Sequence, residues 1–254
     1  SHIKTGLLDV GEVNEHSTSQ IKQVFSEEDS YQVNTLFAIK FGKLWQETYV
    51  RINPSEFINQ DVITDGDVIL ITGGMGGVAL SIAKTISEKH HVTFILLSRN
   101  DIYQIHSPSD YVKQKLALIE QIKCNGSVVL THAVDIGNDD SFNRALLNKL
   151  ALNKDITGVI HTAGVEPLAP EHYNIQNVKR ALAGKVYGLR NILQYINIDK
   201  LKYLACTSSL ASILGDVNRI EYCAANSYLD YLAVDRNKLG STHVVSINWP
   251  GWSD

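Results

Sequence analysis

The sequence predicts a doubly wound α/β fold, in which the strands of one parallel sheet alternate with helices along the chain. Three observations predict it. From residue 68 onward, short apolar runs alternate with amphipathic stretches of helical period. The apolar runs are almost continuous, which is typical of parallel strands covered on both faces. A glycine-rich stretch at 73–77 joins the first run directly to the first amphipathic stretch, as expected where a strand turns tightly into a helix.

The first strand is expected at 68–72, and the helix after the glycine-rich stretch at 78–86, where apolar residues recur at helical spacing. The alternation continues with strands at 92–97, 127–134, 158–161, 203–207 and 244–247, and with helices at 111–124, 141–152, 177–196 and 221–239. Strands that alternate with helices in this way predict a single sheet with helices on both faces.

Residues 1–62 differ from this pattern and look like the tail of another domain. They predict a strand at 5–10, a helix at 17–25 and a hairpin at 36–52 with its turn at Gly42-Lys43. The stretch 52–66 is the expected boundary, because Pro54 and Asp65-Gly66 interrupt regular structure at both ends. We therefore expect two domains, 1–62 and 63–254.

The overall composition is that of an ordinary globular protein. Of 254 residues, 44% are hydrophobic and 20% are charged, and the net charge of −4 favours neither nucleic acid nor a membrane surface as a partner. No apolar run approaches the roughly 20 residues of a membrane span. Cys124, Cys206 and Cys223 are widely spaced and odd in number, which fits neither a disulfide framework nor a metal site and favours a reducing, cytoplasmic location.

The glycine-rich stretch is a candidate phosphate-binding loop. It follows the strand that ends at Thr72 and consists of Gly73, Gly74, Met75, Gly76 and Gly77. Backbone N–H groups and the helix N-terminus can face a pyrophosphate there, since glycines let the main chain approach closely. Ala79 replaces the last glycine of the usual pattern and still permits close packing of helix on strand. The alternative is a purely structural turn.

The end of the second strand indicates which dinucleotide would bind. Folds that prefer NAD carry an acid there for the ribose 2′-hydroxyl, whereas this chain has Ser98-Arg99. A guanidinium can pair with the 2′-phosphate of NADPH through two parallel hydrogen bonds. We therefore expect NADPH, although Asp101 keeps NAD open and Arg99 could also be a solvated surface residue.

Two further strand ends are candidate cofactor contacts. Asp135-Ile136 follows the third strand and is expected to contact adenine, and the segment with His161, Ala163 and Gly164 is expected to bring backbone against a ribose. Each could instead be a strand-end turn.

Lys185 is unexpected on its helix. It shares a face with Val178, Leu182 and Leu189, and a buried ammonium costs free energy unless something pairs with it or uses it. The alternative is that the side chain reaches the helix edge and the charge stays in water.

Ser209, Tyr222 and Asn226 complete a candidate catalytic set. Ser209 follows an apolar strand, at the sheet edge where ligands of open α/β folds bind. Tyr222 begins the next helix, and Asn226 lies one turn later on the same face. Taken singly, Ser209 would more often be a helix cap, Tyr222 a packing aromatic and Asn226 a solvated polar residue. Together with Lys185 they form a reductase set.

From about residue 66, three-quarters of the chain resembles the ketoreductase domains of modular polyketide synthases and hybrid peptide synthetases, which are Rossmann folds of the short-chain dehydrogenase type. The motifs occur in family order, from the glycine loop through Ser98-Arg99 to Asn248-Trp249-Pro250-Gly251-Trp252. Ordinary short-chain dehydrogenases carry lysine four residues after the tyrosine. This chain has Asn226 there and Lys185 on the preceding helix, as the synthase domains do.

The resemblance implies a role for each site residue. Hydride would come from NADPH, Tyr222 would donate a proton to the ketone oxygen, Ser209 would hydrogen-bond that oxygen, and the Lys185 ammonium would stabilise the phenolate. Asn226 would help to hold Lys185 or a relay water, and Pro250 and Gly251 would contact the cofactor.

The resemblance also implies partners, and it leaves alternatives open. The substrate would be tethered by phosphopantetheine to an acyl or peptidyl carrier protein, among neighbouring synthase domains. Residues 1–62 would belong to a structural subdomain, and the catalytic one would be truncated before its lid. An α-ketoacyl substrate and an inactive scaffold domain remain alternatives. Family members that make one alcohol configuration carry Leu-Asp-Asp after the His-x-Ala-Gly motif, and others carry Trp eight residues before the tyrosine. This chain has Glu166-Pro167-Leu168 and Leu214 there, so the resemblance assigns no configuration to the alcohol.

Overall fold

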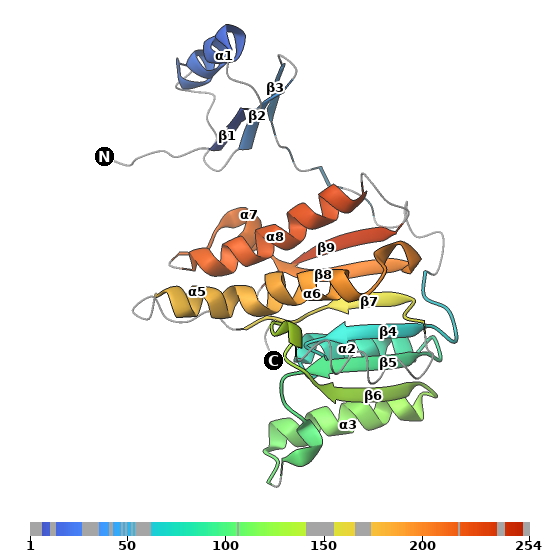
Figure 1. Ribbon diagram of the computed structural model, residues 1–254. Helices are drawn as coiled ribbons and strands as arrows, with labels where there is room; N and C mark the ends of the chain where they lie inside the picture. The colour runs from blue at the N-terminus through green and yellow to red at the C-terminus, as the bar shows by residue number, and fades with distance from the viewer. Residues whose placement is uncertain are drawn as a thin grey trace. The chain divides into compact units, whose positions relative to one another are not determined.

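A computed structural model of the chain describes residues 7–10, 14–26, 36–40, 43–46, 48, 50, 51, 53, 62–105, 107–140, 155–165, 174–217, 219–237 and 242–250. The chain divides into two compact units, Ser1–Asn59 and Gln60–Asp254 (Figure 1). No helix among the described residues is both long and apolar enough to span a membrane.

The described residues of the first unit form one small sheet and one helix. Its elements are β1 (Leu7–Val10), α1 (Glu15–Ser26), β2 (Leu36–Lys40) and β3 (Lys43–Gln46). β2 pairs with β1 in parallel and with β3 in an antiparallel hairpin. Asn14 begins α1, since its Oδ1 accepts from the N–H of Ser17 at 2.9 Å. The expected strand, helix and hairpin are present, but the hairpin's second strand ends at Gln46, and Gly42 lies outside the described residues. The assignment of this unit to a structural subdomain stays a prediction.

The second unit contains a six-stranded parallel sheet. Its strands are β4 (Val68–Thr72), β5 (Thr93–Ser98), β6 (Val128–Ala133), β7 (Gly158–His161), β8 (Tyr203–Ser209) and β9 (His243–Trp249), in the spatial order β6-β5-β4-β7-β8-β9. The expected doubly wound sheet is thus confirmed. The chain runs outward from β4 to one edge and then returns to β7, so the direction of winding reverses between β4 and β7.

Helices cover both faces of this sheet. They are α2 (Gly77–Ser87), α3 (Asp110–Cys124), α5 (Ile175–Leu182), α6 (Gly188–Tyr195), α7 (Ala211–Leu214) and α8 (Ile220–Asn237), with short 3₁₀ turns η2 (Ile102–Gln104) and η5 (Ile198–Lys200). The expected helix at 141–152 lies outside the described residues. The helix expected at 177–196 is continuous but contains a π-helical segment, η4 (Ala183–Tyr187), between α5 and α6.

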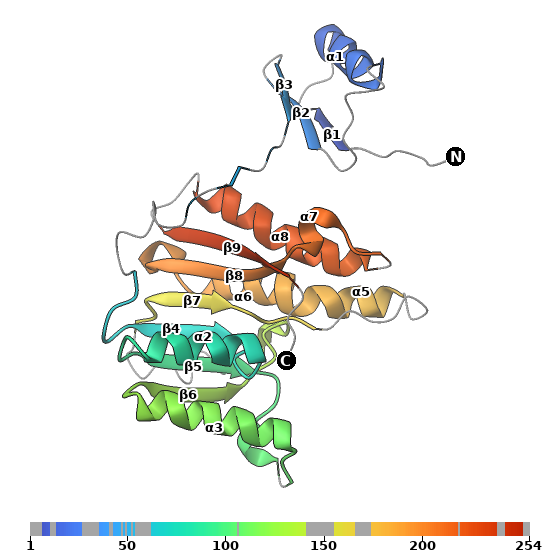
Figure 2. The same cartoon turned by 180° about the vertical axis from the view of Figure 1, so that it is seen from behind.

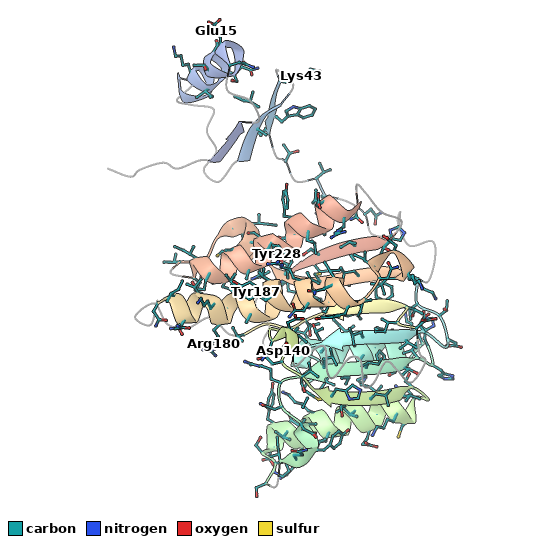
Figure 3. All side chains as sticks on the ribbon, viewed as in Figure 1. Glu15, Lys43, Asp140, Arg180, Tyr187 and Tyr228 are labelled. Atoms are coloured by element: carbon teal, nitrogen blue, oxygen red, sulfur yellow. The ribbon has the colours of Figure 1, made fainter. Side chains whose placement is uncertain are left out.

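Two separate apolar cores explain why the strands are apolar almost throughout. Side chains alternate between faces along a strand. In β4, Val68 and Leu70 join the core beneath α6 and α8, whereas Ile69 and Ile71 join the core beneath α2 and α3. Figure 1 looks onto the α6 and α8 face, Figure 2 shows α2 on the other face, and Figure 3 draws the side chains between the layers.

Candidate active site

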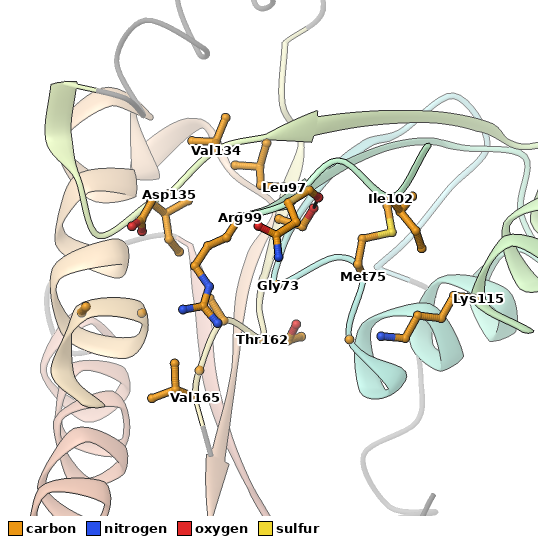
Figure 4. Close-up of a pocket in the computed structure, with 18 of the residues that line it drawn as sticks. Gly73, Met75, Leu97, Arg99, Ile102, Lys115, Val134, Asp135, Thr162 and Val165 are labelled. Carbon is orange, nitrogen blue, oxygen red and sulfur yellow. Dashed lines mark hydrogen bonds between the residues drawn. The ribbon is translucent and has the colours of Figure 1, made fainter. Parts of the chain in front are cut away.

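A cavity of about 530 Å³ opens at the carboxyl ends of β4, β5, β6 and β7, where the winding of the sheet reverses (Figure 4). Ligands of open α/β sheets bind at such a reversal because the loops on either side of it diverge. The structure brings most of the predicted cofactor residues together on its wall: Gly73, Met75, Gly76, Ser98, Arg99, Asp135, Ile136, Ala163 and Gly164.

The glycine loop forms the floor of this cavity through close backbone contacts. Gly73 has a φ of +65°, and a Cβ there would lie 2.9 Å from the Cα of Ala163 in the loop after β7. Gly74 donates its N–H to the carbonyl of Leu97 at 2.8 Å. Gly73 therefore lets two loops meet, whereas Gly74 ties the glycine loop to β5 and does not line the cavity.

The start of α2 has the features of an anion site. Gly76 is its N-cap and provides no side-chain hydrogen bond, so the N–H groups of the first turn have no capping side chain. Such N–H groups and the helix dipole favour a phosphate. Gly77 begins the helix without lining the cavity.

Thr72 and His161 lie beneath the cavity and contact each other. Both are completely buried. Thr72 Oγ1 lies 2.9 Å from His161 Nδ1, and His161 Nε2 lies 3.2 Å from the carbonyl oxygen of Lys185. Burial, together with the smaller effect of the positive charge of Lys185, lowers the pKa of His161 to about 3. A neutral imidazole thus joins β4, β7 and η4 beneath the cavity. Neither residue lines the cavity, and their contact with the cofactor stays a prediction.

Among the described residues, three cationic side chains line the cavity, of which the sequence indicated only Arg99. Lys115 of α3 and Arg180 of α5 are the others. Figure 4 shows Arg99 and Lys115 extending into the cavity from opposite sides. The Lys115 ammonium lies 4.0 Å from the centre of the Tyr111 ring, which also lines the cavity. Asp101 does not line it, and its Oδ1 instead accepts from the N–H of Tyr103 at 2.9 Å.

A second cavity, of about 500 Å³, lies beside the ends of β8 and β9. It brings together three of the four predicted catalytic residues: Lys185 from η4, Ser209 from the end of β8, and Tyr222 from the first turns of α8. Pro250 also lines it, and Gly251 lies outside the described residues. Ser209 Oγ accepts from the N–H of Ala211 at 3.2 Å, which leaves the hydroxyl proton available to another acceptor.

Lys185 is buried and does not reach the helix edge, since only 7% of its surface is exposed. Its ammonium donates to the carbonyl oxygen of Thr207 at 2.7 Å. Burial lowers the pKa of Lys185 to about 8, against the smaller opposing effects of Cys206 and Asp230. π-helical turns often occur at functional sites, and here one carries this lysine.

Asn226 lies beneath the cavity wall. It is completely buried, and its Nδ2 donates to the carbonyl oxygen of Tyr222 at 2.8 Å. Its Oδ1 has no hydrogen-bond partner among the residues that the structure describes. The side chain therefore supports the turn that carries Tyr222 and keeps one buried acceptor. Lys185 has the carbonyl of Thr207 as its partner instead.

The two cavities are linked through Gly164 and Lys185. A Cβ on Gly164, which lines the first cavity, would lie 3.2 Å from Cε of Lys185, which lines the second. No group of three or more His, Cys, Asp or Glu side chains in the described part of the chain could hold a metal ion.

Comparisons with known proteins identify the family of the chain. Residues 67–254 match the family described as KR domain. Polyketide synthase GfsA of Streptomyces halstedii is 28% identical over 216 residues, which cover 85% of this chain and 3% of that protein. Polyketide synthase PksM of Bacillus subtilis is 28% identical over 193 residues, covering 76% of this chain and 4% of that protein. The chain thus spans a small fraction of the length of these relatives.

Solved structures share the fold. A-type ketoreductases from a modular polyketide synthase align with a TM-score of 0.78 at 22% identity, covering 98% of this chain and 50% of that one. A multidomain structure of a keto acid-selecting peptide synthetase module aligns with a TM-score of 0.73 at 18% identity, covering 95% of this chain and 20% of that one. Because the family match extends over most of its length, the chain belongs to the KR family, the ketoreductase domains of polyketide synthases with the short-chain dehydrogenase fold.

Proposed function

We propose that the chain reduces a ketone on a carrier-bound β-ketoacyl thioester with NADPH. The observation that carries the proposal is the meeting of Lys185, Ser209 and Tyr222 on one cavity wall, from three different elements. This second cavity adjoins, through Gly164, the first cavity, which has the features of a dinucleotide site.

The first cavity fits a dinucleotide in shape and charge. The Gly73 backbone lies against Ala163 without a side chain between them, and the uncapped start of α2 suits a pyrophosphate. Arg99, Lys115 and Arg180 give this cavity positive charge, which favours a cofactor with the additional negative charge of a 2′-phosphate. Asp101, the residue that favoured NAD, caps η2 instead. These features support NADPH over NADH.

The second cavity fits a carbonyl that gains charge during reduction. Bound NADPH would supply a hydride to the carbonyl carbon. The Ser209 hydroxyl, whose proton is available, would donate to the carbonyl oxygen, and the Tyr222 hydroxyl would transfer its proton to that oxygen. The buried Lys185 ammonium would stabilise the phenolate that Tyr222 leaves behind. The free Oδ1 of Asn226 would hold a water through which the proton is replaced.

The activity is tested by following NADPH absorbance with a β-ketoacyl pantetheine thioester and, in parallel, an α-ketoacyl one. Turnover of the β-keto thioester is the expected result, and preference for the α-keto thioester would move the proposal to α-keto acid reduction. Tyr222→Phe should lower kcat at least about 100-fold and leave NADPH affinity unchanged. Tyr228→Phe, on the same helix and outside both cavities, is the matched control. NADPH binding without turnover of any ketone would instead indicate a scaffold domain.

The cofactor preference is tested with Arg99→Gln. We expect the Kd for NADPH to rise by about tenfold or more, as for the loss of a charge-assisted contact, with little change for NADH. Lys113→Gln is the control, because Lys113 pairs with Asp110 at 2.8 Å on α3 and lies outside the cavity. Equal effects on NADPH and NADH would remove Arg99 from 2′-phosphate recognition.

A further inference from the structure

The Asp230 carboxylate is the centre of a polar cluster that the reaction itself does not use. Asp230 lies on α8, eight residues after Tyr222. Its Oδ1 accepts from the hydroxyl of Ser246 in β9 at 2.5 Å, and its Oδ2 accepts from the hydroxyl of Ser212 in α7 at 2.5 Å and from the amide of Asn248 in β9 at 2.9 Å. One carboxylate thus joins three elements.

The same cluster reaches the main chain of Ser209. The carbonyl oxygen of Ser209 lies 2.8 Å from Ser212 Oγ and 3.2 Å from Asn248 Nδ2. Asn248 Nδ2 also lies 2.7 Å from Ser212 Oγ. The hydroxyls of Ser212 and Ser246 and the amide of Asn248 carry four protons, and the acceptors within reach are the two carboxylate oxygens, this carbonyl and the Ser212 hydroxyl oxygen. Asp230 therefore provides most of the acceptor capacity that orders the cluster.

The connection matters because the reaction needs Ser209 and Tyr222 on the same carbonyl oxygen. Ser209 ends β8, whereas Tyr222 belongs to α8. The separation of two such hydroxyls has to hold to well under an ångström, since a misplacement of about 1 Å can cost about 100-fold in rate. Asp230 of α8 accepts hydrogen bonds from Ser212 and Asn248, the two side chains that also donate to the Ser209 carbonyl oxygen.

We propose that Asp230 is a positioning residue, which through Ser212 and Asn248 holds Ser209 at a fixed distance from Tyr222. The proposal rests on the proposed function of Ser209 and Tyr222. Asp230 contacts neither cavity wall and takes no proton in the reaction. Its negative charge also raises the pKa of Lys185, against the larger lowering by burial, so the same carboxylate supports a second member of the site.

The test compares Asp230→Asn with two matched variants. Asp235→Asn makes the same change at an exposed position of α8. Ser246→Ala removes the hydrogen bond from Ser246 to Asp230, which does not connect Asp230 to Ser209. Asp230→Asn should lower kcat for the β-ketoacyl thioester by about 10- to 100-fold with the Kd for NADPH within about twofold, whereas both controls should keep kcat within about threefold. Ser212→Ala, which leaves Asp230 bonded to Ser246 and Asn248, should act in the same direction if Asp230→Asn does not fold.

A second readout does not depend on turnover. Amide hydrogen exchange of residues 207–215 should be faster in Asp230→Asn and Ser212→Ala than in the wild-type chain, and unchanged in Asp235→Asn. If the wild-type chain turns over no ketone but exchange responds in this way, the proposed function fails and the positioning holds. Unchanged exchange and unchanged kcat overturn the positioning. So does an equal fall of kcat in Asp230→Asn and Ser246→Ala, which would indicate general destabilisation.

Discussion

Replacing Gly73 with alanine should lower both the stability of the fold and the affinity for NADPH. The same replacement at Gly66 separates the two causes of the stability loss. Gly73 has a φ of +65°, where an L side chain costs about 1–2 kcal/mol. Its Cβ would also lie 2.9 Å from Cα and 3.0 Å from N of Ala163, and both are backbone atoms that cannot rotate away. Overpacking of this kind costs about a further 1–3 kcal/mol.

Gly66 is the matched control. Its φ is +85°, and a Cβ there would meet no atom within 4 Å. Gly66→Ala therefore has the backbone cost alone, about 1–2 kcal/mol. It precedes β4, at the amino ends of the strands, whereas the cofactor cavity lies at their carboxyl ends. The stability difference between the two variants should thus be the overpacking cost of about 1–3 kcal/mol.

Urea denaturation and an NADPH fluorescence titration measure the two effects. Gly73→Ala should lose more stability than Gly66→Ala and should bind NADPH about tenfold or more weakly, because relief of the clash moves the loops after β4 and β7 apart; tenfold corresponds to about 1.4 kcal/mol. Gly66→Ala should bind NADPH as the wild-type chain does. Equal stability losses together with an unchanged Kd for Gly73→Ala would refute the reasoning.

Three further predictions follow from buried polar groups. The folded pKa of His161 is lowered to about 3, so below pH 6.5 the unfolded chain binds a proton that the native chain does not. Stability present at pH 7 should then fall by about 1.4 kcal/mol per pH unit on acidification toward pH 4, and urea denaturation of His161→Gln should show a shallower dependence if this histidine is responsible. The Tyr203 hydroxyl is buried without a partner among the described residues, so Tyr203→Phe should raise stability by up to about 1 kcal/mol; a lower melting temperature would count against this. Lys202 pairs with the buried carboxylate of Asp67 at 2.8 Å and is itself 40% exposed. Lys202→Met should therefore lower the free energy of unfolding by about 1 kcal/mol after allowance for screening. A double-mutant cycle with Asp67→Asn should give a coupling energy of the same size.

Much of the fold could be predicted because its signals are local. The strands of the second unit are recognisable since two separate cores require apolar residues at successive positions, as Val68 and Ile69 show. Lys185 was recognisable because an ammonium on an apolar helix face is costly wherever the helix packs, and its burial in the structure agrees. The spacing of Tyr222 and Asn226 within one helix was likewise a local property.

Other features depend on residues far apart in the chain. Thr72 and His161 stand at strand ends, but only the pairing of β4 with β7 places their side chains against each other beneath the cavity wall. Lys115 carries no motif, and it reaches the cofactor cavity only because α3 packs beside the loop after β5. The π-helical segment η4 around Lys185 packs closely against Gly164, and helical periodicity predicts neither the segment nor this contact.

The sequence by itself determined the class of fold, the glycine loop, the cation after β5 and the four candidate catalytic residues, because periodicity, burial cost and short spacings are properties of neighbouring residues. Only the tertiary structure decided the strand order β6-β5-β4-β7-β8-β9 and therefore which loops meet. It also decided that Asp230 bonds across α7 and β9 to the support of Ser209. The physical reason is that hydrogen-bond partners are chosen by sheet order and helix packing, which arise from contacts between segments far apart along the chain.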